Sequence, residues 1–200
     1  MSTIVGFLLE ATKMPILDRE PDIYPANLFD DQERLADKTR RWWSIYTMSR
    51  REKDLMRKLY QKQIAFFGPT VAKRYRSPNG RLRTSYIPLF PNYIFVFANE
   101  AEKYEAMTTN CVSRANEIND TEMLLTDLRQ IQAACLSGVP LTPEAKLQSG
   151  DQVRVRSGPF AGYDGLVIRR EGKTRLLLSV RFLEQGVSME IDEGLLEVIV

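Results

Sequence analysis

The segment PLFPNYIFVF, residues 88–97, contains the strongest structural signal in the N-terminal half of the chain. Its last five residues, 93–97, are all aromatic or aliphatic, without the polar alternation of a strand that faces water on one side. Such a run is typical of a strand buried on both faces. Pro88 and Pro91 lie close to Phe90, and prolines hold the chain extended. The pattern predicts a buried strand over 93–97, preceded by a loop that could present Phe90 outward.

Upstream of this strand, residues 42–47 are rich in strand formers and predict a second strand. Ser49 and Glu52 then have the spacing of a capping box. Apolar residues at near-helical spacing follow, and they predict a helix over 51–66 that ends before Gly68-Pro69.

Between these two strands, the sequence predicts a hairpin with strands over 70–76 and 81–88. Asn79-Gly80, the strongest short hairpin signal, lies at its turn. The expected tip is densely basic, with Lys73, Arg74, Arg76, Arg81 and Arg83.

Downstream, residues 101–109 predict a further helix, and Asn119 or Asp120 can cap another. That helix has one clean apolar face, and Ser137-Gly138 ends it. Its apolar positions are Leu124, Leu128, Ile131 and Cys135.

The residue pattern changes near residue 148, after a segment with two prolines that is typical of a linker. Five short strands with turn signals between them follow in about 50 residues, and they predict a small all-β barrel. We therefore expect an α+β protein with four parts. These are an acidic N-terminal extension (1–39), a domain with an antiparallel sheet and flanking helices in an α/β sandwich (40–138), a linker (139–147) and the barrel (148–200).

The extension contains three prolines and shows poor periodicity. We expect an extended segment with apolar anchors at 14–17 and 23–25, and a short helix near 29–39. Its role is open: it could mask a basic surface or bind a partner.

The chain contains no histidine, which excludes Ser-His-Asp and Cys-His catalytic pairs and most zinc sites. Its two cysteines, Cys111 and Cys135, fit neither a zinc pattern nor a disulfide framework, and we expect both to be packing residues. No run of apolar residues is long enough to span a membrane, and the first residues do not read as a signal peptide. These features favour a cytoplasmic protein that acts by binding, without a metal or cofactor and not as an enzyme.

The net charge of +2 conceals a strong asymmetry along the chain. Residues 40–100 carry 13 basic and 3 acidic side chains, whereas residues 1–39 carry 4 basic and 8 acidic ones. The basic block is also rich in aromatic residues, a combination that suits nucleic acid, although most of the rings are better explained as core.

Four motifs together resemble the NusG family. RWWSIY at 41–46 and PLFPNYIFV at 88–96 are similar to its N-terminal domain, and GDQVRV at 150–155 and GPFAGYDG at 158–165 are similar to its KOW domain. The resemblance covers residues 40–200. The sequence LFPNY at 89–93 resembles specialised paralogues of the RfaH type more than the housekeeping member of the family. The extension 1–39 has no counterpart in the minimal family plan.

The resemblance implies a transcription elongation or antitermination factor of bacteria. Such an N-terminal domain binds the β′ clamp helices of RNA polymerase and can touch the β gate loop, and it contacts non-template or upstream DNA. The KOW domain, with an SH3-like barrel fold, recruits Rho or a small-subunit ribosomal protein. We expect a monomer.

The resemblance also implies site residues. Phe90, with Pro91 beside it, and Tyr46 match the surface that binds the clamp helices, whereas Tyr93 and Phe95 are assigned to the core. Thr108 and Thr109 are what remains of a histidine-threonine cluster that touches the gate loop, so this second contact is in doubt. Basic residues implied to reach nucleic acid are Arg50, Arg51, Lys53, Arg57, Arg74, Arg76, Arg81 and Arg83. Lys58 could extend this patch or point away from it.

In the KOW domain, Phe160 and Tyr163 flank the loop implied to bind the second partner, and packing at the end of the barrel explains them equally well. Two other functions stay open. A KOW-type RNA-binding or ribosome-associated protein is disfavoured by the net charge of −1 over 148–200. A magnesium-dependent enzyme on nucleic acid is disfavoured because the basic block lacks a clustered acidic motif.

Overall fold

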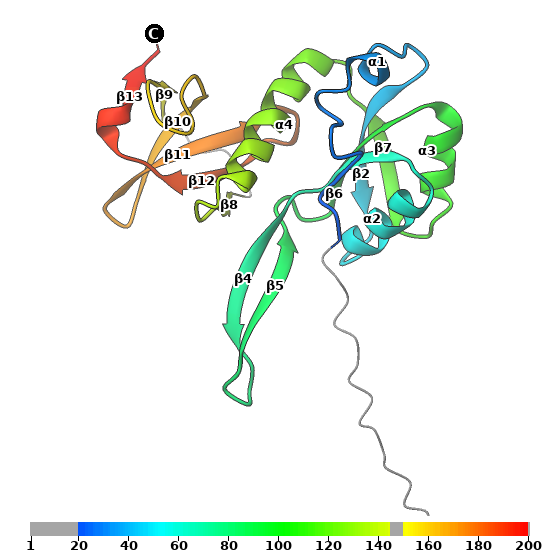
Figure 1. Ribbon diagram of the computed structural model, residues 1–200, viewed down its shortest axis with the longest axis horizontal. Coiled ribbons are helices and arrows are strands. Elements are labelled where there is room, and N and C mark those ends of the chain that lie inside the picture. The colour runs from blue at the N-terminus through cyan, green and yellow to red at the C-terminus, as the bar shows by residue number, and fades with distance from the viewer. Residues whose placement is uncertain (1–19, 145–149, 200) are drawn as a thin grey trace, which may run out of the picture.

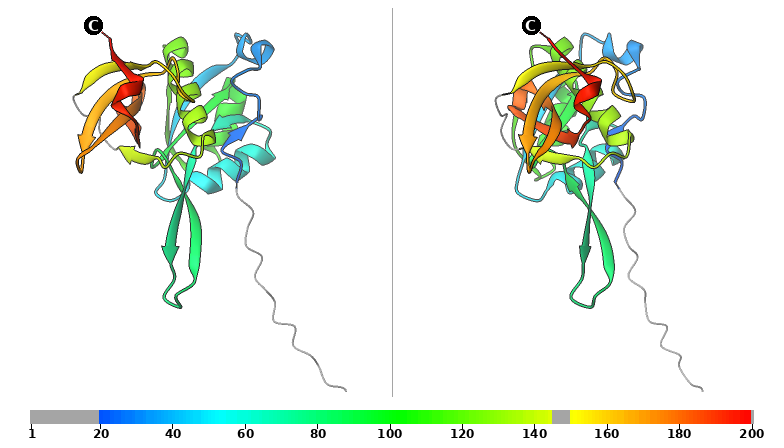
Figure 2. Two further views of the ribbon diagram at one scale, coloured as in Figure 1. Left: turned by 60° about the vertical axis from the view of Figure 1, so that its left-hand side comes forward. Right: turned by 90° about the vertical axis from the view of Figure 1, so that its left-hand side faces the viewer.

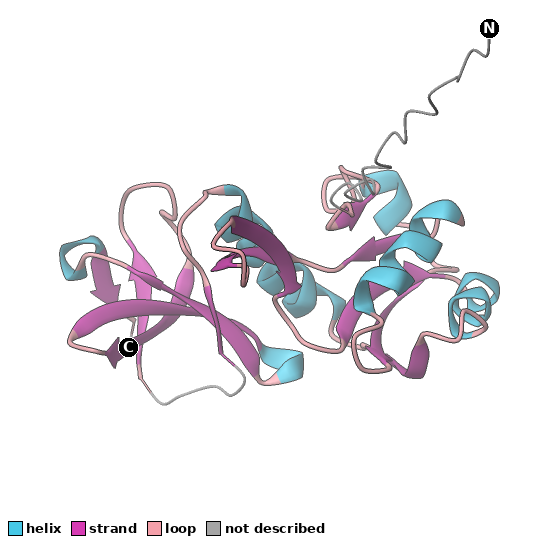
Figure 3. Ribbon diagram, turned by 90° about the horizontal axis from the view of Figure 1, so that it is seen from below, coloured by secondary structure: helices cyan, strands magenta, loops and turns pink. Residues whose placement is uncertain are grey.

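The computed structural model describes residues 20–144 and 150–199 (Figure 1). The N-terminal half holds a five-stranded antiparallel sheet with helices on both faces, and a two-stranded hairpin extends from it. The C-terminal half holds a six-stranded antiparallel sheet. Figure 3 shows helices gathered in the first half and strands dominating the second. The α+β prediction is confirmed, and the strand-rich C-terminal half is consistent with an SH3-like barrel.

The N-terminal sheet has the order β1-β3-β6-β2-β7, with β6 (Tyr93–Ala98) at its centre. The others are β1 (Ile23–Tyr24), β3 (Ala65–Phe67), β2 (Arg41–Thr47) and β7 (Val112–Glu117). Five consecutive residues of β6, from Ile94 to Ala98, are buried, as expected of a strand covered on both faces.

Side chains alternate across this sheet and form two separate cores. On one face, Trp43 and Ile94 pack with Leu55 of α2 (Glu52–Gln61) and Ala106 of α3 (Glu100–Met107). On the other face, Trp42, Phe95 and Phe97 belong to a cluster with Leu128 and Ile131 of α4 (Thr121–Leu136). Leu28 and Phe29 join this second cluster, so part of the predicted extension completes the N-terminal core.

The extension is otherwise close to the sequence prediction. The anchor at 23–25 contains β1, and the short helix is α1 (Gln32–Leu35). The second anchor, at 14–17, lies outside the described residues.

Helix α2 differs from its prediction at both ends. Ser49 does not cap it, because the helix starts after Arg51 and the carboxylate of Glu52 accepts a hydrogen bond from the backbone N–H of Asn92, 2.9 Å away. The helix stops at Gln61 instead of reaching 66, since Gln63 turns into the left-handed region (φ 56°) and β3 follows. The prediction of helix for residues 64–66 is therefore wrong, because a short apolar run suits a buried strand equally well.

The predicted hairpin consists of β4 (Thr70–Arg76) and β5 (Leu82–Pro88). Gly80 takes the positive φ of 75° that the turn requires. The views of Figures 1 and 2 agree that the hairpin projects away from both halves of the molecule.

Helix α4 begins and ends as predicted. Asp120 accepts a hydrogen bond from the N–H of Met123 at 3.0 Å, and the C-cap is Ser137, followed by Gly138 at φ 73°. The helix also packs against the C-terminal half: Asp127, 5% exposed, accepts hydrogen bonds from the guanidinium and the backbone N–H of Arg181.

The C-terminal sheet has the order β13-β9-β10-β11-β12-β8. All five predicted strands are present, and β8 (Thr142–Glu144) adds an edge strand from the segment expected to be linker. The five strands are β9 (Asp151–Val155), β10 (Asp164–Arg170), β11 (Lys173–Val180), β12 (Gln185–Glu190) and β13 (Leu196–Val198), with short 3-10 turns η1 (Arg181–Leu183) and η2 (Glu193–Leu195).

No helix in the described ranges, 20–144 and 150–199, combines the length and apolar character that a membrane span requires.

Candidate functional site

The hairpin carries a set of basic side chains that we call the hairpin cations. All are exposed, residues 70–88 contain no acidic side chain, and none of the set forms an ion pair within the described part of the chain. Their charge is therefore available to a partner, and a two-stranded ribbon of this kind is small enough to approach a polyanion closely. The hairpin cations are Lys73, Arg74, Arg76, Arg81 and Arg83.

The second basic set lies at the start and along the surface of α2, and we call its members the α2 cations: Arg50, Arg51, Lys53, Arg57 and Lys58.

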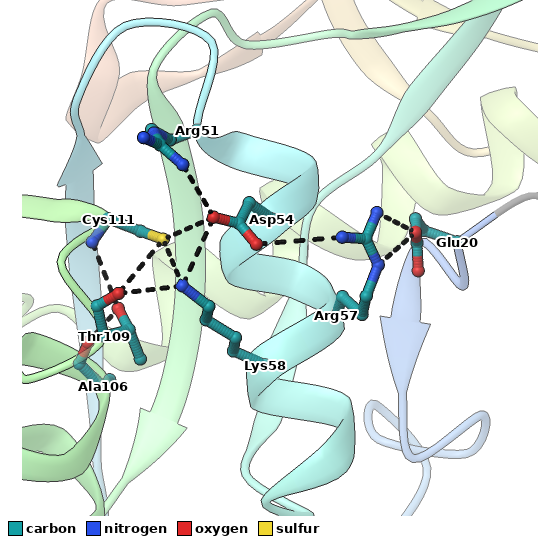
Figure 4. Close-up of polar contacts among 8 residues, drawn as sticks. All are labelled: Glu20, Arg51, Asp54, Arg57, Lys58, Ala106, Thr109 and Cys111. Carbon is teal, nitrogen blue, oxygen red and sulfur yellow. Dashed lines mark hydrogen bonds and ion pairs between the residues drawn. The ribbon is translucent and has the colours of Figure 1, made fainter. Parts of the chain in front are cut away.

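Three of the α2 cations meet the carboxylate of Asp54 (Figure 4). Its Oδ2 lies 3.1 Å from Arg51 and 3.3 Å from Lys58, and its Oδ1 lies 3.7 Å from Arg57. The thiol of Cys111, which is fully buried, also donates to Oδ2 at 3.3 Å. The thiol hydrogen bond, with Lys58 and Arg51, holds the pKa of Asp54 below its usual value of 3.8.

Lys58 points away from the patch, one of the two readings that the sequence left open. Its ammonium group donates to the carbonyl of Thr109 at 2.9 Å and lies 3.4 Å from Cys111 Sγ, so it ties α2 to the end of α3 (Figure 4). Arg57 turns to the extension, where its guanidinium binds the carboxylate of Glu20 at 2.7 Å and 2.9 Å. Arg50 and Lys53 form no ion pair within the described residues.

The residues expected to bind polymerase fall into two places. Tyr46 is half-buried on the α4 side of the sheet, edge-on to Tyr93 with ring centroids 5.0 Å apart. Arg114 of the neighbouring strand β7 lies over the Tyr46 ring at 4.9 Å, so the sheet register adds a cation that the sequence motif did not indicate. Tyr93, assigned to the core from sequence, packs against the apolar cluster but is only half-buried, and its ring also contacts Tyr46.

Phe90 does not take the outward position that its two prolines suggested. Its side chain is 1% exposed and meets Phe95 edge-on, at a centroid separation of 6.3 Å. Tertiary packing explains the difference, because the ring gains more from the cluster beside α4 than from water. Pro91, next in the chain, is exposed.

Thr108 and Thr109 lie at the C-terminal end of α3, the helix that packs on the opposite face of the sheet from Tyr46. Their hydroxyl groups donate to backbone carbonyls of the last helical turn, at 2.9 Å and 2.7 Å. Thr108 is exposed and Thr109 is half-buried. Next to them, Tyr104 is 69% exposed, which leaves this helix end open to a partner.

In the C-terminal half, Phe160 and Tyr163 lie together in the loop between β9 and β10, with ring centroids 5.8 Å apart. Phe160 is 8% exposed and belongs to the apolar cluster, so packing explains it well. Tyr163 is half-buried, and burial raises the pKa of its phenol. Of the pair, Tyr163 has the larger accessible surface.

The residues that the structure describes contain no cluster of potential metal ligands. No group of three or more cysteines, aspartates or glutamates there could hold a metal ion. What the described surface offers a partner is charge on the hairpin and partly exposed rings on the sheet.

Three comparisons with known proteins complete the description. Residues 40–129 match the family model NusG, described as transcription termination factor nusG. No curated protein matches the chain. Solved structures do match, among them one described as the crystal structure of the MjSpt4:Spt5 complex in conformation B, with a TM-score of 0.25 and 15% identity; the match covers 79% of this chain and 96% of that chain. The family match thus covers the segment from β2 into α4, residues 40–129.

Proposed function

We propose that the protein is a non-enzymatic transcription elongation factor that binds RNA polymerase through its N-terminal domain. The observation that carries this proposal is the family match over residues 40–129, which include four of the five strands of the N-terminal sheet, the hairpin and the first part of α4. Binding that bridges the polymerase cleft would hold the clamp closed and make the enzyme more processive. The site of action would be the bacterial cytoplasm.

The proposed contact with the β′ clamp helices centres on Tyr46 and Pro91, with Phe90 behind them. A partly exposed aromatic ring held by neighbours is the kind of anchor that carries much of the binding energy at an interface. Tyr93 and Arg114 hold the Tyr46 ring in place, and this support favours it over a freely rotating side chain. Thr108 and Thr109 would provide the second contact, with the gate loop of the β subunit.

The proposed contact with non-template or upstream DNA is made by the hairpin cations, with Arg50 and Lys53 as supporting charges. Such contacts neutralise phosphates, so they depend steeply on salt and do not read the base sequence. The C-terminal half would recruit Rho or a small-subunit ribosomal protein through Tyr163 and Phe160. Antitermination, as in specialised members of the family, is the outcome we propose for this combination.

The test is binding of the full chain to core RNA polymerase at moderate salt. Tyr46→Ala should weaken binding about tenfold, as loss of an interface anchor does. Tyr60→Ala is the matched control, because Tyr60 is 49% exposed and also lies edge-on to a tyrosine, Tyr24, at 5.1 Å. Equal binding by wild type and Tyr46→Ala would remove Tyr46 from the interface, and absence of binding by the wild type would overturn the proposal.

Phe90 needs a milder substitution than alanine, because emptying a buried phenylalanine site costs about 3–5 kcal/mol of stability. Phe90→Leu keeps most of the apolar volume. A selective loss of polymerase binding by a folded Phe90→Leu protein would support direct contact; unchanged binding would leave Phe90 as a core residue.

A further inference from the structure

The hairpin carries two large apolar side chains that packing does not explain. Tyr75 is 46% exposed and Leu82 is 67% exposed. Neither residue has an aromatic or cation–π partner within the described part of the chain.

The hairpin has no layer to cover such side chains. Strands β4 and β5 form a separate two-stranded sheet, and from Ala72 to Arg76 every residue of β4 is exposed. Figures 1 and 2 show both strands standing clear of the rest of the molecule. A stable fold gains little from a tyrosine here, since 46% of its surface stays in water.

The strand register groups these side chains by face. Tyr75 is paired with Arg83, and Lys73 with Ser85, so these four side chains share one face of the ribbon. Arg74, Arg76, Leu82 and Thr84 share the opposite face. Residues two apart in a strand are separated by about 6.5–7 Å, and directly paired residues by about 5 Å. The Tyr75 ring is therefore flanked by one cation along its strand and one across from it.

Protection of the strand edges accounts for only part of this composition. Lysine and arginine on an exposed ribbon prevent pairing with another chain. An exposed tyrosine and leucine on the same ribbon have the opposite tendency, because they add apolar surface. The cations are explained either by protection of the strand edges or by ligand binding. The Tyr75 ring between two cations is explained only by ligand binding, and it suits a ligand that is anionic and flat.

We propose that the Tyr75 face of the hairpin binds single-stranded nucleic acid, with one unpaired base stacked on the Tyr75 ring and flanking phosphates on Lys73 and Arg83. This deepens the proposed function, on which the choice of a nucleic-acid partner rests. Bases in single strands expose their flat faces and stack on aromatic side chains, while the bases of a duplex are stacked on one another. The site therefore discriminates single strands from duplex by stacking and not by charge.

The experiment measures binding of the full chain to a labelled 15-nucleotide DNA, an RNA of the same sequence and the DNA duplex, by fluorescence anisotropy over a range of salt. Tyr75→Leu should weaken single-strand binding about tenfold and leave duplex binding within about twofold. The slope of log Kd against log salt should not change, because no charge is removed. Tyr75→Phe should retain wild-type affinity.

The matched charge variant is Lys73→Gln, on the same strand and the same face. It should weaken single-strand binding and reduce the salt slope by about 0.7, the opposite signature to that of Tyr75→Leu. A DNA with one 5-iodouracil should crosslink to Tyr75 under ultraviolet light in wild type and lose that crosslink in Tyr75→Leu. The DNA and RNA arms identify which strand the site takes.

The outcomes separate the two proposals. If the wild type binds single strands and Tyr75→Leu binds equally well, the stacking site is refuted and the charge contact stands. If the wild type prefers duplex, the stacking site is refuted as well. If the wild type binds none of the three nucleic acids, both the stacking site and the DNA contact of the proposed function are refuted, while polymerase binding is decided by the Tyr46 experiment.

Discussion

The hairpin and helix α2 each present five basic residues, yet they differ in what those charges face. Three of the α2 cations meet carboxylates, at Asp54 and Glu20, whereas none of the hairpin cations does within the described residues. A phosphate that approaches α2 must compete with these carboxylates, and one that approaches the hairpin does not. A count of basic residues in the sequence therefore overstates the binding capacity of α2 and not that of the hairpin.

The largest expected effect comes from replacing all five hairpin cations, Lys73, Arg74, Arg76, Arg81 and Arg83, with glutamine. Affinity for a 15-nucleotide single strand should fall at least a hundredfold at low salt. The slope of log Kd against log salt should drop by up to about 3.5, if each cation neutralises one phosphate. Anisotropy titrations between low and moderate salt measure both quantities, and thermal melting checks that the N-terminal core is intact.

The matched control replaces the five α2 cations with glutamine and so removes the same charge. We expect a loss of affinity at least tenfold smaller than for the hairpin variant, because Arg51, Arg57 and Lys58 are held by carboxylates and, within the described residues, only Arg50 and Lys53 have no ionic partner. An equal or larger loss from the α2 variant would contradict this difference between the two sets and make α2 the main nucleic-acid contact.

The next prediction concerns Asp54, the carboxylate that binds three of the α2 cations. Asp54→Asn removes the carboxylate that holds Arg51, Lys58 and the Cys111 thiol, so the free energy of unfolding should fall by about 2 kcal/mol. That corresponds to a decrease in Tm of about 4–8 °C for a chain of this size. Nucleic-acid affinity should rise severalfold, because the freed cations become available. Weaker binding by a folded Asp54→Asn protein would contradict the inference that Asp54 lowers the affinity of the α2 cations for nucleic acid.

The Asp54 contribution should depend on pH in a defined direction. Its pKa lies below the usual 3.8 in the folded protein, because the Cys111 thiol, Lys58 and Arg51 stabilise the ionised form. A depressed pKa means that the stabilisation is complete above about pH 4–5 and is lost as the pH falls through the folded-state value. Urea unfolding of wild type and Asp54→Asn should therefore give curves that converge between about pH 5 and 3. A difference that stays constant over this range would assign the effect of Asp54→Asn to packing.

Local sequence signals predicted the elements that such signals determine. The continuous apolar run 93–97 and the turn Asn79-Gly80 led to β6 and to the hairpin, because burial on two faces and a positive φ demand those residues. The hairpin cations were equally visible, since acidic residues are absent from the whole of 70–88. The clean apolar face and the capping residues of α4 likewise predicted that helix.

Long-range packing decided what the sequence did not indicate. The prolines beside Phe90 suggested an exposed ring, but contact with Phe95 buries it. Glu52 has the spacing of a capping residue, yet it binds Asn92, 40 residues away. The supporting contact of Arg114 with Tyr46 depends on the pairing of β2 with β7, and β7 was not predicted because its sequence, VSRANE, lacks strand formers after the first residue.

The smallest expected effect concerns the acidic extension, and it tests whether Glu20 lowers the nucleic-acid affinity of the α2 cations. Glu20 lies 37 residues before Arg57 in the chain and binds its guanidinium, which is 40% exposed. An ion pair with that much solvent contributes less than about 1 kcal/mol, so Glu20→Gln should lower the free energy of unfolding by no more than this. Binding to a single strand should tighten about twofold, because one α2 cation is released, and the gain should be absent in a protein that also carries Arg57→Gln.

Glu33→Gln removes the same charge from an exposed side chain of α1 that has no ionic partner in the described residues, and it should leave affinity unchanged. If both glutamine variants tighten binding equally, the extension acts through its net charge; if only Glu20→Gln does, it acts through the contact with Arg57.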